Sequence, residues 1–196
     1  MKPSYIVKRV TTPDWTQIPA VTLTHQPWLE KNDVEASAQM CHDGETIYVR
    51  LTAKEKNIRA TLTEPLSMVC NDSCLEFFFS PESGARYFNF EWNPLGTLYL
   101  GFGAERSTRT RLMVKDKEAL FAPQPFETAD GWGIEFKVPV TFIRMFFPAF
   151  DLRAATANFY KCGDQTEKPH YLAWSSLTSE RPDYHRANDF GALVFE

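Results

Sequence analysis

The fold is decided by the stretch CLEFFFSPESGARYFNFEWNPLGTLYLGF, residues 74–102. Within it, residues 74–81, 86–93 and 97–102 have the alternation expected when successive side chains point to opposite faces of a sheet. Turn-forming residues separate these runs at 80–84 and at 94–96. The order of strand, turn, strand, turn and strand predicts a β-meander.

One face of this meander is aromatic and the other is polar. Phe90 and Trp92 share one face of the second strand, whereas Asn89 and Glu91 share the opposite face. Large rings in strands usually fill a core. We therefore expect Trp92, and Trp174 further along the chain, to be core residues.

The remaining segments continue the pattern of short strands. An Asp-Gly turn at residues 42–45 predicts a hairpin. Pro139 and Pro148 bracket residues 140–147, which predicts one short helix. Strands are predicted at residues 36–41 and 47–53, on either side of the Asp-Gly turn, and at 133–138, 152–160, 171–174 and 192–195. The sequence predicts an all-β sandwich with at most one short helix, formed by residues 1–196 as a single domain.

Composition and charge narrow the classes of function. Hydrophobic residues make up 43% and charged residues 23% of the chain, which is typical of a folded domain. The net charge is −4 without a dense basic stripe, so no nucleic-acid partner is expected. No run approaches the ~20 apolar residues of a membrane helix. The N-terminus lacks the apolar region of a secretory signal, which predicts a cytoplasmic protein, or a secreted or periplasmic one if an export signal has been removed.

The cysteines admit two interpretations. Cys70 and Cys74 have the spacing of half a zinc site, but structural zinc sites usually combine two such pairs. Cys74 also lies in a hydrophobic run. We therefore predict buried free thiols and assign no metal ligand.

Polar side chains recur on strands whose other face is apolar. They are Glu76, Asn89, Glu91, Thr156, Asn158 and Tyr160. If these strands are neighbours, the side chains share one sheet face. Sugar hydroxyls donate and accept hydrogen bonds, which amides and carboxylates complement, and a rigid sheet lowers the ordering cost of binding. The alternative is an ordinary solvated outer face.

Glu76 has three candidate roles: a ligand-binding carboxylate, a calcium ligand, or a buried structural group. A glutamate inside an apolar run needs a partner. Arg50 or Arg86 is the expected partner.

Short motifs follow one another along the chain in a fixed order. They are Asp72-Ser73-Cys74-Leu75-Glu76-Phe77-Phe78, the run from Arg86 to Gly96, Trp132, Asn158-Phe159-Tyr160-Lys161-Cys162, Ala173-Trp174-Ser175 and Phe190-Gly191-Ala192-Leu193. From about Trp15 to the C-terminus, their order and spacing resemble those of family 9 carbohydrate-binding modules, close to the subgroup associated with bacterial xylanases.

The resemblance implies an immunoglobulin-like β-sandwich that binds the ends of xylan- or cellulose-type sugars, such as the reducing end, without catalysis. It implies a role in polysaccharide catabolism, with glycoside hydrolases as candidate associates. It also adds calcium as a candidate cofactor, whereas the residues themselves assign none.

The resemblance also implies site residues. Two tryptophans clamp the terminal sugar in the family, and their places here hold Met68 with Val69, and Tyr184 with His185. Tyr184 is expected to be exposed, because it lies in a polar stretch, and to stack on the sugar. The positions that would bond sugar hydroxyls are Asn89, Glu91, Thr156, Asn158 and Arg181.

Three other functions remain open. Glu76 and Glu91 would be the carboxylates of a glycoside hydrolase if they lay ~5–10 Å apart across a cleft. Met68 and His170 would be the axial ligands of a haem-binding, cytochrome-like domain. An interaction domain without a small ligand would show no thermal stabilisation by any sugar.

Overall fold

The predicted meander forms the centre of one sheet. The computed structural model describes residues 2–82 and 86–196, so the turn expected at 80–84 lies partly outside the described residues. The strands β5 (Cys74–Ser80), β6 (Tyr87–Trp92) and β7 (Leu98–Gly103) pair antiparallel in sequence order. Phe77 lies opposite Phe90, which lies opposite Leu100, so apolar side chains align across all three strands.

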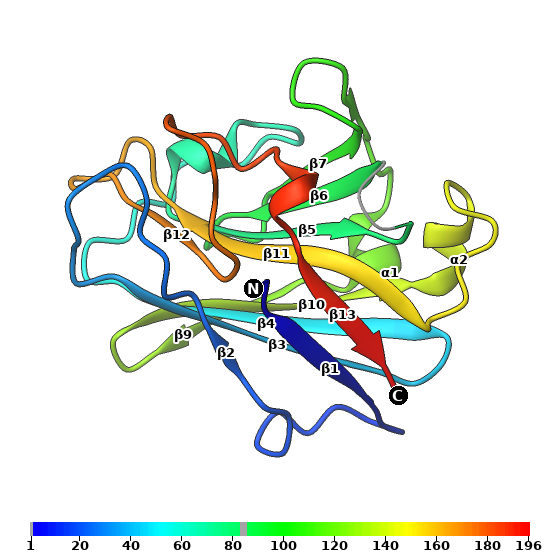
Figure 1. The fold of residues 1–196 in the computed structure, drawn as a ribbon. Helices are drawn as coiled ribbons and strands as arrows, with labels where there is room; N and C mark the ends of the chain where they lie inside the picture. The colour runs from blue at the N-terminus through cyan, green and yellow to red at the C-terminus, as the bar shows by residue number, and fades with distance from the viewer. Residues whose placement is uncertain (1, 83–85) are drawn as a thin grey trace.

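Ten further strands complete the sheet system (Figure 1). They are β1 (Ser4–Arg9), β2 (Val21–Thr22), β3 (Glu35–His42), β4 (Thr46–Lys54), β8 (Thr110–Arg111), β9 (Gln124–Thr128), β10 (Gly131–Pro139), β11 (Ala154–Cys162), β12 (Tyr171–Ala173) and β13 (Gly191–Phe195). The strand order is β8-β7-β6-β5-β11-β13-β1-β3-β4-β10-β9, with β12 on β11 and β2 on β3. The all-β prediction is therefore confirmed.

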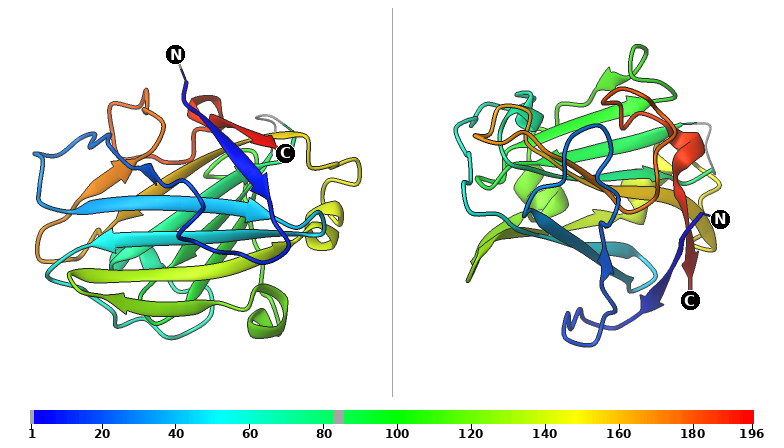
Figure 2. Two further views of the ribbon diagram at one scale, coloured as in Figure 1. Left: turned by 90° about the horizontal axis from the view of Figure 1, so that it is seen from below. Right: turned by 60° about the vertical axis from the view of Figure 1, so that its left-hand side comes forward.

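The strands form two layers that enclose an aromatic core. In Figure 2, strands β3, β4 and β10 run across the front of the left-hand view, and the green strands of the meander cross behind them. The inward rings of the meander, such as Phe77, Phe90 and Trp92, pack with Phe136 of β10. Trp92 is fully buried and Trp174 is 6% exposed, which confirms both as core residues.

Strand β1 joins the two layers. Its first residues pair in parallel with β13, from Ser4 opposite Ala192 to Val7 opposite Phe195. Its last two residues pair in parallel with β3 in the other layer. One short strand thus continues both sheets and closes one side of the sandwich.

The hairpin prediction is confirmed, whereas the number of helices is not. Gly44 has φ of +102°, and the Asp43 carboxylate accepts bonds from the backbone of Glu45 and Thr46, which fixes the turn between β3 and β4. The expected helix is α2 (Val140–Arg144). A second helix, α1 (Lys117–Phe121), was not predicted.

That second helix is built from local signals. Asp116 caps it by accepting a bond from Ala119 N–H, and Phe121 anchors it in the core. Among the described residues, no helix is long and apolar enough to cross a membrane.

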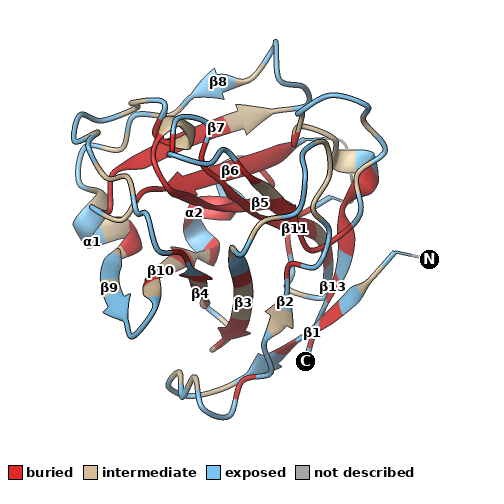
Figure 3. Cartoon of the chain, turned by 90° about the vertical axis from the view of Figure 1, so that its left-hand side faces the viewer, coloured by how far each residue is buried: buried red, intermediate tan, exposed pale blue. Residues whose placement is uncertain are grey.

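The outer face of the meander is covered as well. Every residue of β5 and β6 is buried, and Figure 3 shows both strands in red along their length. A second apolar cluster lies on this face, where Phe78, Tyr87 and Tyr160 pack against Tyr184 and Phe190. The alternative of a solvated outer face is therefore wrong for these strands.

Candidate functional site

A small pocket lies between this outer face and the loops above it. Its volume is about 110 Å³. It is lined by Trp28, Met68, Cys70, Glu76, Glu91, Arg106, Arg109, Cys162, Asp164, Tyr171, Pro182, Asp183, Tyr184 and His185. The mixture of aromatic, acidic and basic side chains makes it the candidate site.

The floor of the pocket contains two acidic side chains. Glu76 in β5 lies directly opposite Glu91 in β6, and both are buried. Burial raises the pKa of Glu91 to about 7, although the Asn89 amide donates to Glu91 Oε1 at 2.7 Å and counteracts the rise. Burial and the neighbouring Glu91 raise the pKa of Glu76 well above its ordinary value.

Aromatic side chains form one wall. Trp28 lies in the loop between β2 and β3, half-buried, with its ring 5.4 Å from Tyr171 and 5.6 Å from Tyr184. Its backbone has φ of +75°, which is unusual for a bulky residue, and its indole N–H donates to Ser179 O at 2.7 Å. His25 pairs with Ala173 of β12 and ties this loop to the sheet.

Basic side chains also line the pocket. Arg109 donates to the Tyr99 hydroxyl at 3.3 Å and lies over the Tyr99 ring. Arg106 is at the rim, with its side chain 61% exposed and 3.9 Å from the Asp183 carboxylate. Both guanidiniums lower the pKa of Glu91, which places positive charge near the acidic floor.

Tyr184 is not exposed, contrary to the prediction. It is 8% exposed, because its ring stacks on Tyr160 at 3.9 Å and its hydroxyl donates to Lys161 O and Leu172 O. Tyr184 nevertheless lines the pocket. The polar stretch around it misled the prediction, since it packs over a sheet face that is itself apolar.

The structure brings only some of the predicted site residues together. Glu91 and Tyr184 line the pocket, and Asn89 supports Glu91. Thr156 and Asn158 share the same sheet face but lie outside the pocket lining, because Phe78 stands between Asn89 and Asn158 in the strand register. Arg181 is exposed and does not line the pocket either.

Asn158 is engaged within the protein. Its side-chain N–H donates to Ser175 O at 3.1 Å, and its Oδ1 accepts from Ser175 N–H at 2.9 Å. Asn158 therefore ties the segment that follows β12 to strand β11.

The arginine partner expected for Glu76 is wrong. Arg50 pairs with Glu135, and Arg86 pairs with Glu82. Instead, Glu76 Oε1 accepts a bond from Cys162 Sγ at 2.9 Å.

The haem alternative does not fit the environment of His170. This side chain is 1% exposed; its Nε2 lies 2.6 Å from Lys161 Nζ and its Nδ1 lies 2.9 Å from Lys168 O. Both ring nitrogens are therefore engaged inside the protein, and neither is available as an axial ligand for iron.

Calcium does not fit the one candidate cation cluster in the described part of the chain. That cluster of three or more His, Cys, Asp or Glu side chains consists of Cys74, Glu76 and Cys162. Calcium takes six to eight oxygen ligands. Two sulfur atoms and one carboxylate do not supply them.

Sequence reasoning missed most of the pocket wall, including its tryptophan, one of its tyrosines and its arginines. Trp28, Arg109 and Tyr171 lie in loops or at the ends of short strands, where no alternation marks a shared face. Trp28 stood out only as a tryptophan directly after a proline in a polar segment.

Comparisons with known proteins agree with this architecture. The family model described as "Carbohydrate-binding family 9" matches residues 11–195. No match was found among curated proteins. A putative carbohydrate-binding protein from Bacteroides uniformis ATCC 8492 is 29% identical, with a TM-score of 0.85 and 100% coverage of both chains.

Two structures of a family 9 module from Caldicellulosiruptor kristjanssonii share the fold at 9% identity. The complex with glucose has a TM-score of 0.69 and covers 99% of this chain and 96% of that one. The complex with cellotriose has a TM-score of 0.67, and the match covers 99% of this chain and 94% of that one.

Proposed function

Since this chain belongs to carbohydrate-binding family 9, we propose that it binds the terminal sugar of a cellulose- or xylan-type oligosaccharide in the pocket beside Trp28, without transforming it. The observation that carries the proposal is one small hollow that combines an aromatic wall with buried carboxylates and guanidiniums. Hydroxyls and apolar C–H faces of a sugar require both kinds of surface.

The size of the pocket supports binding of a chain end. Its volume of about 110 Å³ is well below the ~300–1,000 Å³ of pockets that enclose drug-sized ligands. A single terminal ring matches this volume better than an internal stretch of polysaccharide. Among the polar side chains of the lining, Glu91 and Arg109 are the ones proposed to bond its hydroxyls.

Trp28 is the proposed stacking residue. The tryptophan expected before the Asp-Ser motif is replaced by Met68 and Val69, and Tyr184 already has one ring face against Tyr160. The Trp28 backbone adopts a strained conformation and its indole is tied to Ser179 O. Such strain persists where the surrounding structure imposes it, often at binding sites.

Binding without catalysis is favoured over glycoside hydrolysis. Glu76 and Glu91 are direct cross-strand partners in one sheet. A glycosidase needs its two carboxylates on either side of a scissile bond. Both carboxylates here line the floor of the pocket, so they would lie beneath a sugar bound there and not on either side of its scissile bond.

Calorimetric titration tests the proposal. Wild-type protein should bind cellotriose or xylotriose, and Trp28→Ala should weaken the affinity by about tenfold or more, because an aromatic contact of ~1.5 kcal/mol is lost. Trp15→Ala, a half-buried tryptophan outside the pocket lining, is the matched control and should retain wild-type affinity. The proposal is wrong if no glucose-, cello- or xylo-saccharide gives binding heat or thermal stabilisation.

A further inference from the structure

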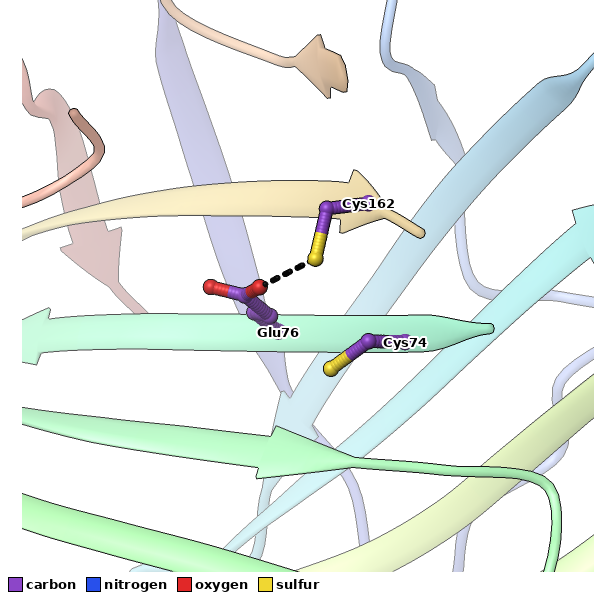
Figure 4. A group of neighbouring side chains, drawn as sticks. All are labelled: Cys74, Glu76 and Cys162. Carbon is purple, nitrogen blue, oxygen red and sulfur yellow. Dashed lines mark hydrogen bonds between the residues drawn. The ribbon is translucent and has the colours of Figure 1, made fainter. Parts of the chain in front are cut away.

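Two cysteines and a glutamate meet on the outer face of the meander. Cys74 in β5 and Cys162 in β11 are direct antiparallel partners, although they lie far apart in the sequence. Glu76 lies two residues beyond Cys74, so its side chain projects from the same face. Figure 4 shows the Cys162 sulfur facing the Glu76 carboxylate, with Cys74 beside Glu76 on the neighbouring stretch of strand, and the three ligand atoms all lie within 4.8 Å of one another.

The cluster is buried and has no cationic partner among the described residues. Cys74, Glu76 and Cys162 are at most 2% exposed. No ion pair in the described part of the chain includes Glu76, whose recorded hydrogen-bond donor is the Cys162 thiol. A carboxylate in such a place is expensive to ionise unless positive charge compensates it.

We propose that Cys74, Cys162 and Glu76 bind one zinc ion. Two sulfur atoms and one carboxylate oxygen are ligands that zinc accepts, whereas calcium and magnesium select oxygen ligands. Tetrahedral zinc bonds of ~2.0–2.3 Å hold neighbouring ligand atoms roughly 3.5 Å apart. Cys162 Sγ and Glu76 Oε1, which are 2.9 Å apart without metal, would therefore move slightly apart, a change that side-chain rotation can supply.

The chemistry of the three groups is consistent with metal uptake. Burial raises the pKa of Cys74 to about 12 and also raises the pKa of Glu76, so negative charge on the metal-free cluster is disfavoured. Zinc binds thiolates and carboxylates. Zinc would therefore displace the thiol protons and supply the positive charge that the buried cluster lacks.

The pocket provides an entry route and a fourth position. Glu76 and Cys162 line the pocket, whereas Cys74 lies behind them. Three protein ligands leave one tetrahedral position for a water molecule or another exchangeable ligand. The half-buried Cys70 also lines the pocket.

Metal binding can be measured on the full chain with its thiols kept reduced. Equilibrium dialysis against zinc should give one ion per chain by elemental analysis, and excess calcium should not displace it. Cobalt, used as a spectroscopic probe, should show a thiolate-to-metal charge-transfer band. Cys74→Ser and Cys162→Ser should each weaken zinc binding by about 100-fold or more and remove most of that band, since each deletes one ligand.

Matched controls separate the site from nonspecific thiol binding. Cys41→Ser alters a buried cysteine in β3 of the other layer and should leave zinc stoichiometry and affinity unchanged. Glu76→Gln keeps both sulfurs and should weaken zinc binding while retaining the charge-transfer band, which provides a test if a serine variant fails to fold. Failure of the reduced wild-type protein to retain zinc, or equal loss in Cys41→Ser, would overturn the proposal.

Discussion

The rings of Tyr160 and Tyr184 lie parallel, with centroids 3.9 Å apart and an interplanar angle of 6°. Tyr160 belongs to strand β11, whereas Tyr184 belongs to the long segment that crosses the outer face of the meander. The Tyr160 hydroxyl also donates to Tyr184 O at 3.1 Å. This pair fixes the covering segment over the sheet and thereby shapes one side of the pocket.

Removal of the Tyr184 ring should destabilise the fold. Tyr184→Ala should lower the free energy of unfolding by ~3–5 kcal/mol, as for other buried aromatic residues. Tyr184→Phe loses only the bonds to two backbone carbonyls and should cost ~1 kcal/mol. Urea unfolding measures both values, and equal losses in the two variants would contradict this account of the ring.

The charge of Glu91 should contribute to sugar affinity. Glu91→Gln preserves the shape of the side chain and an acceptor for the Asn89 amide. The variant removes a charge-assisted hydrogen bond, so we expect affinity to fall by roughly tenfold. Calorimetry with cellotriose measures the change, and undiminished affinity would place the sugar away from Glu91.

Asn158 should matter for stability and not for sugar binding. Asn158→Ala leaves the backbone N–H and C=O of Ser175 without their side-chain partner in a buried place. We expect a loss of ~1–3 kcal/mol in the free energy of unfolding. At a temperature where the variant remains folded, its sugar affinity should stay within about twofold of wild type; a larger decrease would bring Asn158 into the site.

His185 should make the fold sensitive to acid. Burial, together with Arg109 and Arg106, lowers its pKa from 6.5 to about 3. Between these two pKa values the unfolded chain binds more protons at this histidine than the folded protein does. The free energy of unfolding is therefore unaffected by this group above pH 6.5 and decreases as the pH falls toward 3. Protonation of this one group changes the free energy of unfolding by at most ~1.4 kcal/mol per pH unit.

A substitution at His185 isolates this contribution from those of other buried groups. His185→Asn keeps an acceptor near the Tyr87 hydroxyl but cannot be protonated. Its unfolding free energy should fall less steeply between pH 6.5 and 4 than that of wild type, as measured by urea unfolding at each pH. A His185→Asn variant with the wild-type slope would contradict this assignment.

The meander and its core were accessible to prediction because local alternation carries the information. Phe88, Phe90 and Trp92 follow the two-residue repeat, and all three are buried in the observed core. The sharing of one outer face by Glu76, Glu91 and Asn158 also followed from alternation. Strand β1 was missed because its burial alternates over only six residues and its partners lie at distant points in the chain.

The pocket could not be predicted to the same extent. A residue on the outer face is exposed or buried according to the loop that crosses above it. The two-residue alternation within a strand carries no information about that loop. Asn158 faces Ser175, whereas Glu91 faces a hollow, although both follow the same alternation. Cys74 lies opposite Cys162 because of the register between β5 and β11. The spacing of Cys70 and Cys74 in the sequence does not reveal this pairing.

The parallel pairing of β1 with β13 has a consequence for the order of folding. Residues 4–7 pair with residues 192–195, at the far end of the sequence, whereas Lys8 and Arg9 pair with β3. The hairpin of β3 and β4 and the meander join strands that are neighbours in the sequence, so they can form before β1 finds β13. Such distant contacts slow folding, so the side of the sandwich that β1 closes should form late.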